Sequence, residues 1–112
     1  MNYFVIPGMI RPDNMRKEYG LRKPNAIIAA VLAHFEITYD QLILKSQKAE
    51  IVYRRQVLIY LLYKHTMMSC IKIGKLTGKD RTTIPHCVKH LKDLIETDPE
   101  IREEIENLQE NI

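Results

Sequence analysis

The stretch "SCIKIGKLTGKDRTTIPHCVKHLKDLI", Ser69 to Ile95, decides the fold. Ser69 is a good N-cap for a helix over "CIKIGKL", and Gly78 is a typical residue for the end of that helix. A second helix is expected to begin at Asp80 or Thr82, and it is rich in basic and hydroxyl side chains. Two short helices joined by a turn that contains glycine are the arrangement of a helix-turn-helix motif.

The second helix has two chemically different faces. Apolar residues at three- and four-residue spacings form one stripe, which predicts burial of that side: Ile84, Cys87, Val88, Leu91, Leu94 and Ile95. The opposite side carries Thr82, His86, Lys89 and Asp93, with Lys79, Arg81 and His90 beside them. Such charges can serve solubility alone, but this face lacks the Glu residues that usually alternate with Lys on a passive helix. We therefore expect it to meet base edges and phosphates in a major groove.

The rest of the chain predicts further helices and an N-terminal arm. Residues 1–24 are interrupted by three Pro and two Gly residues, so we expect an arm there, within which "YFVI" is a candidate for a short strand. Helices are expected over 25–35, 38–44 with Thr38 as N-cap, and 50–65, whose core side is Val57, Leu58, Leu61 and Leu62. A last helix opens with Asp98 as N-cap and Pro99 at its first position. Residues 25–112 are thus expected to form one all-α domain of about six helices.

Charge is unevenly distributed along the 112 residues. The formal net charge is only +3, but eleven Lys or Arg residues and only two acidic residues fall between Lys45 and Lys92. Residues 98–112 contain six acidic residues against Arg102. A concentrated positive charge of this kind is typical of a protein that binds a polyanion.

The sequence favours a cytoplasmic protein without a membrane span. Cys70 and Cys87 are the only cysteines, which fits reduced thiols in the cytosol. The N-terminus "MNYFVIPGMI" lacks the basic start of a secretory leader, and no apolar run approaches the ~18 residues that cross a bilayer.

Three segments resemble the C-terminal DNA-binding domain of the bacterial replication initiator DnaA: "KSQKAEIVYRRQVLIYLLYKHT", "SCIKIGKLTGKDRTTIPHCVKHLKDLI" and "DPEIREEIENL". The likeness covers roughly residues 25–112, and "KDRTT" with a following His, close to the family signature "GGRDHTT", is its most specific part. The resemblance implies an all-α, Trp-repressor-like domain with a helix-turn-helix, bound to double-stranded DNA. It also implies a role in replication or transcription control and a bacterial or phage origin. No GxxxxGK[ST] motif occurs, so we expect a DNA-reading domain alone, without ATPase activity.

The resemblance also implies individual roles. Thr82 and His86 fall on positions that face bases, and Thr83 falls on a position that contacts phosphate. Lys79 and Asp80 stand at the Arg and Asp of the signature.

Four differences from the family pattern lie in the same segment. A single Gly78 replaces paired glycines, Lys79 replaces Arg, Arg81 replaces His, and Pro85 stands inside the recognition helix. With Thr82 as N-cap, Pro85 falls at the third helical position, where no internal hydrogen bond is lost.

A second basic cluster precedes and opens the long helix. It consists of Lys45, Lys48, Arg54 and Arg55, and Arg55-Gln56 matches the Arg-Gln of the family. We expect this cluster to contact phosphate or the minor groove beside the recognition helix.

Other functions have weaker support. His86, His90 and the adjacent Cys87 have metal-ligand spacing, but Cys87 points into the apolar stripe and no further ligand is in place. No catalytic residues, metal site or cofactor are expected. The alternative to DNA binding is a protein-interaction or self-association module in residues 98–112, using the stripe Ile101, Ile105, Leu108 and Ile112. That stripe is short for a coiled coil and is expected to pack back on the domain.

Overall fold

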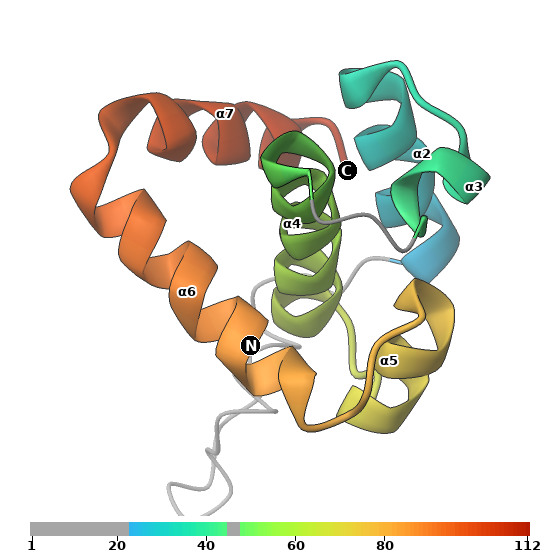
Figure 1. Ribbon diagram of the computed structural model, residues 1–112. Coiled ribbons are helices and arrows are strands. Elements are labelled where there is room, and N and C mark those ends of the chain that lie inside the picture. Colours follow the sequence, from blue (N-terminus) through green and yellow to red (C-terminus); the bar gives the residue numbers. More distant parts are fainter. Residues whose placement is uncertain (1–22, 45–47) are drawn as a thin grey trace, which may run out of the picture.

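The computed structural model describes residues 23–44 and 48–112. These residues form only helices, with no strand among them, which confirms the all-α prediction (Figure 1). The expected N-terminal arm and its "YFVI" segment lie outside the described residues, except for Lys23 and Pro24. The helices are α2 (Pro24–Phe35), α3 (Tyr39–Leu42), α4 (Ala49–His65), α5 (Cys70–Thr77), α6 (Thr83–Thr97) and α7 (Pro99–Glu110).

Side-chain caps set the starts of three helices, as their sequences predict. The Thr38 hydroxyl accepts from the backbone N of Gln41 at 3.2 Å, and the Gln41 side chain accepts in return from the Thr38 N–H at 2.9 Å. The Ser69 hydroxyl caps α5, and the Asp98 carboxylate caps α7. Each of these caps satisfies N–H groups that the first turn of a helix leaves without an intrahelical acceptor.

Helix α4 lies in the centre of the molecule and packs against α2, α3, α5 and α6 (Figure 1). The predicted core residues Val57, Leu58, Leu61 and Leu62 are fully buried. Ile59 and Tyr60 are buried as well, so every side of this part of α4 is covered. A helix that is apolar all round in this way is a core helix rather than a surface one.

Helix α6 uses its apolar stripe as predicted. Ile84, Cys87 and Leu91 are buried, while Val88, Leu94 and Ile95 are partly buried against the same core. This side of α6 packs mainly on α4. The helix is therefore anchored by its back, and its outward side is left for the polar residues.

Helix α7 packs back on the domain, also as expected. Ile105 and Leu108 are buried, and Ile101 and Ile112 pack on the same core. The Arg102 guanidinium donates to the carbonyls of Ile95 and Glu96 at the end of α6, at 3.0 and 3.1 Å. The apolar stripe of α7 is thus covered by this chain itself.

Glu104 links α7 to two other helices. Its carboxylate accepts from the Tyr53 hydroxyl on α4, and its other oxygen lies 3.0 Å from Nε2 of His34 on α2. Burial, the hydrogen bond to Glu104 and the nearby negative charges raise the pKa of Tyr53 above its ordinary value. Tyr53 therefore stays a neutral donor to Glu104 at physiological pH.

Candidate nucleic-acid interface

The turn between α5 and α6 is tightly fixed by backbone hydrogen bonds. Helix α5 ends at Thr77 and is followed by its C-cap Gly78, whose φ of +71° lies in the left-handed region that glycine adopts most easily. The Lys79 N–H then donates to the carbonyl of Gly74 at 2.9 Å. The Thr83 N–H donates to the Asp80 carbonyl at 2.9 Å, which turns the chain into α6. These bonds set the angle at which the two helices meet.

Gly74 is a residue whose role the sequence analysis did not identify. It is buried, and a β-carbon there would lie 2.5 Å from the carbonyl oxygen of Lys79. Only glycine therefore lets the turn pass this close to α5. The sequence feature that could have identified this role is a glycine inside a helical pattern, four residues before Gly78.

The start of α6 agrees with the sequence in position but not in capping. The helix begins at Thr83, so Pro85 takes the third helical position, as predicted. Thr82 stands before it with helical backbone angles, and its side chain makes no capping hydrogen bond. The Thr82 hydroxyl instead donates to Oδ2 of Asp80 at 2.7 Å. Thr82 is thus held in the turn by its neighbour Asp80.

The outward side of the turn and α6 gathers most of the predicted site residues. Asp80, Arg81, Thr82, His86, Lys89 and His90 are exposed, and Lys79 and Thr83 are partly exposed. Lys72 and Lys75 of α5 are also exposed and flank the same turn, although sequence reasoning did not single them out. The sequence feature that could have identified them is their place in the basic stretch from Lys45 to Lys92. The surface combines positive charge with hydroxyl and imidazole groups.

Positive charge also reaches the buried side of α6. Burial raises the pKa of the Cys87 thiol, whereas the charges of Lys79 and Arg55 lower it. Burial outweighs these two charges, so the pKa of Cys87 lies above its ordinary value. Cys87 itself faces the core, while His86 and His90 are exposed. Among residues 23–44 and 48–112, no group of three or more His, Cys, Asp or Glu side chains is placed to hold a metal ion.

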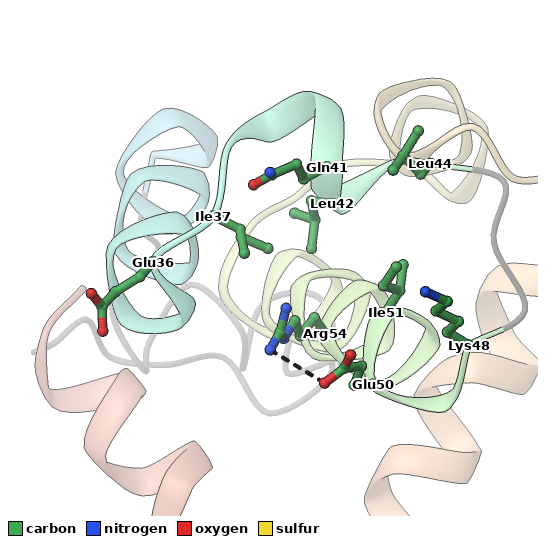
Figure 2. Close-up of a pocket in the computed structure, with 9 residues that line it drawn as sticks. All are labelled: Glu36, Ile37, Gln41, Leu42, Leu44, Lys48, Glu50, Ile51 and Arg54. Atoms are coloured by element: carbon green, nitrogen blue, oxygen red, sulfur yellow. Dashed lines mark ion pairs between the residues drawn. The ribbon is translucent and has the colours of Figure 1, made fainter.

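The second basic cluster is only partly exposed. Lys48, at the start of α4, is exposed, and Lys45 lies outside the described residues. Arg54 lines a pocket between α3 and α4 together with Lys48, Leu44 and Glu50 (Figure 2). Its guanidinium lies 3.8 Å from the Glu50 carboxylate and 5.5 Å from the centre of the Phe35 ring. Arg54 is therefore held against its own domain.

Arg55, for which the sequence predicts a contact with phosphate or the minor groove, is buried. Its side chain is only 3% exposed, and Nη1 donates to the carbonyl of Leu44 at 2.7 Å. Arg55 lies on a side of α4 that the rest of the domain covers, whereas Arg54 lies on a partly exposed side. Arg55 holds the end of the segment before α4 rather than presenting charge to solvent.

Comparison with known proteins gives consistent matches. Residues 24–91 match the family model described as "Bacterial dnaA protein helix-turn-helix". The chain is similar to the chromosomal replication initiator protein DnaA of Bacteroides fragilis, with 40% identity over 84 residues. It is also similar to the proteins of that name from Oenococcus oeni, with 39% identity over 79 residues, and Bifidobacterium animalis, with 35% over 80 residues. These alignments cover 70% to 74% of this chain but only 14% to 18% of each relative.

Proposed function

Because this chain belongs to the bacterial DnaA helix-turn-helix family, we propose that it binds double-stranded DNA, with α6 as the recognition helix. The observation that carries the proposal is the exposed set of basic and hydroxyl side chains on the turn and the N-terminal half of α6. In helix-turn-helix proteins, that end of the second helix contacts base edges while the preceding helix crosses the phosphate backbone.

The charges around the turn support this assignment of phosphate contacts to α5 and base contacts to α6. Lys72 and Lys75 project from α5, where phosphate contacts are expected, and Lys79 follows in the turn. Asp80 is the one acidic side chain in this turn, and its carboxylate is already an acceptor for Thr82. Thr82 and His86 supply the groups for base edges, Thr83 supplies a hydroxyl for phosphate, and Lys89 and His90 extend the contact along α6.

The biological role that we propose is control of replication or transcription through a specific DNA sequence. The relatives are named as chromosomal replication initiators, which favours replication. No GxxxxGK[ST] sequence occurs in the 112 residues, so we propose binding without ATP hydrolysis by this part of the protein. Among the described residues, no helix has both the length and the apolar character needed to cross a bilayer.

Salt dependence of binding tests the proposal. If about five phosphates are neutralised, the logarithm of the binding constant should fall with the logarithm of salt concentration with a slope of about −4 to −5. Fluorescence anisotropy of a labelled duplex between about 50 and 200 mM salt measures this slope. Absence of binding at the lowest salt, or a slope near zero, would refute DNA binding.

Two lysines provide a matched pair of variants. Lys75→Ala should reduce the magnitude of the slope by about one unit, because one phosphate contact is lost. Lys92→Ala removes the same charge, but Lys92 lies about 14 Å along the helix axis beyond Thr83, away from the reading end. It should change the slope by less than half as much. Equal effects would mean that only net charge matters and would contradict the assigned contact surface.

We further propose that Lys45 and Lys48 add a second phosphate contact beside the recognition helix. Lys48 is exposed at the start of α4, next to the segment that Arg55 holds through Leu44. Lys48→Ala should weaken binding to all duplex sequences alike, as expected of a phosphate contact. A loss confined to one preferred sequence would contradict this assignment.

The alternative function, a protein-interaction module in residues 98–112, would need an apolar surface on α7. In its apolar stripe on α7, Ile105 and Leu108 are buried, and Ile101 and Ile112 pack partly buried on this chain's own core. Only the acidic outer side of α7 remains available for association.

A further inference from the structure

We propose that Arg81 reads a guanine in the major groove, so that this chain selects a target different from that of a relative with His at this position. The inference rests on the proposed DNA binding. It starts from the place of Arg81 in the turn directly before α6, where its side chain is exposed. Its backbone carbonyl accepts from the Ile84 N–H at 3.3 Å, so the main chain at Arg81 is fixed.

The Arg81 side chain is not engaged by the domain. Among residues 23–44 and 48–112, its guanidinium makes neither a hydrogen bond nor an ion pair. The nearest acid in sequence is Asp80, but Asp80 accepts from the Thr82 hydroxyl at 2.7 Å instead. Arg54 and Arg55, in contrast, are both held by partners within the domain. Arg81 therefore keeps all its donors for a ligand.

The chemistry of the guanidinium selects the ligand. It is planar, always charged, and presents parallel N–H donors that match the O6 and N7 acceptors of guanine. No other base presents two acceptors side by side in the major groove. A bidentate contact of this kind is worth a preference of about tenfold to a hundredfold over another base pair at that position.

A phosphate is the competing ligand for Arg81. Together with Lys75 and Lys79, Arg81 lines a shallow hollow between α5 and the turn, where a backbone phosphate would be attracted. The guanidinium fork also matches a phosphate, but the two lysines already provide positive charge for a phosphate at this place. The position of Arg81 nearest the start of α6 favours the base edge, because that end of a recognition helix enters the groove.

Selection of binding sites from a random duplex library tests the inference, using the wild type, Arg81→Ala and Arg81→His. We expect the wild type to select guanine at one position. Arg81→Ala should lose that preference by about tenfold or more, with all other positions and the salt slope unchanged. Arg81→His should prefer a different base at that single position. Lys75→Ala serves as the control for a phosphate contact, with an unchanged selected sequence and a reduced slope.

Two other results have separate meanings. If all Arg81 variants select the wild-type sequence and the salt slope falls by about one unit, Arg81 is a phosphate contact and the inference is wrong. If the wild type binds no duplex at low salt, the proposed function itself is wrong. Because Arg81 is exposed and unpaired, its variants should keep the wild-type thermal stability, which a melting curve checks directly.

Discussion

The carbonyl oxygen of Lys79 faces the α-carbon of Gly74, at a place where a β-carbon would come within 2.5 Å of it. The Lys79 N–H also donates to the Gly74 carbonyl at 2.9 Å. Both peptide groups that flank the α-carbon of Lys79 therefore lie against α5, one through its N–H and the other through its carbonyl oxygen. The relative position of α5 and α6, and with it the arrangement of the basic residues, depends on this contact.

Gly74→Ala should destabilise the domain and disturb binding together. The added methyl group must push backbone atoms aside, at a cost of about 1–3 kcal/mol, partly offset by the better helix propensity of alanine. Urea denaturation should show a lower free energy of unfolding with an unchanged m-value, and duplex affinity should fall in the folded protein. Gly78→Asn is the control, because its site is open and asparagine tolerates the left-handed region. Wild-type stability in Gly74→Ala would contradict the close contact.

Arg55→Met should destabilise the domain far more than Arg54→Met. Arg55 is buried and donates to the Leu44 carbonyl, and loss of a buried hydrogen bond from a charged group costs about 1.5–3 kcal/mol. Arg54 is partly exposed and makes a long ion pair with Glu50, which is worth about 0–1 kcal/mol. Denaturation curves of the two variants provide the comparison. If both variants lose the same free energy of unfolding, the buried hydrogen bond from Arg55 to the Leu44 carbonyl does not stabilise the domain as expected.

Tyr53→Phe should change the pH dependence of stability at alkaline pH. Burial and the hydrogen bond to Glu104 raise the pKa of Tyr53 in the folded state, whereas the unfolded tyrosine ionises at about pH 10. The stabilisation from neutral Tyr53 is fully present below about pH 10 and is lost as pH rises further, because the unfolded state then binds fewer protons. The wild type should therefore lose more free energy of unfolding than Tyr53→Phe between about pH 8 and pH 11. Parallel losses would show that Tyr53 titrates normally.

Features that depend on short segments were predictable from the sequence. The caps at Thr38, Ser69 and Asp98 and the helix end at Gly78 follow from local hydrogen bonding and backbone preference. The apolar stripes of α6 and α7 follow from periodicity alone. The cluster of exposed basic residues follows from the short turn that joins α5 to α6.

Features that depend on tertiary packing were not predictable in the same way. Arg55 belongs to a basic run, and nothing local distinguishes it from Arg54, yet the helices around α4 bury one and leave the other partly exposed. The contact of Gly74 with Lys79 appears only when the turn folds back on α5. Thr82 had a suitable side chain for capping, but the helical backbone at that residue directs its hydroxyl to Asp80.

The closure of the domain by α7 has a consequence for its biosynthesis. Ile27 in the first described helix and Leu108 in the last belong to one core cluster, and Glu104 joins α7 to α2 and α4. The ribosome makes α2 and α4 early, and these two helices pack on each other, but the residues of α7 that complete the core emerge only after all of α6 has been translated. Domains generally fold as units during synthesis. This domain therefore completes its core only after α7 has left the ribosome, and until then the apolar surface that Ile105 and Leu108 cover remains exposed to chaperones and proteases.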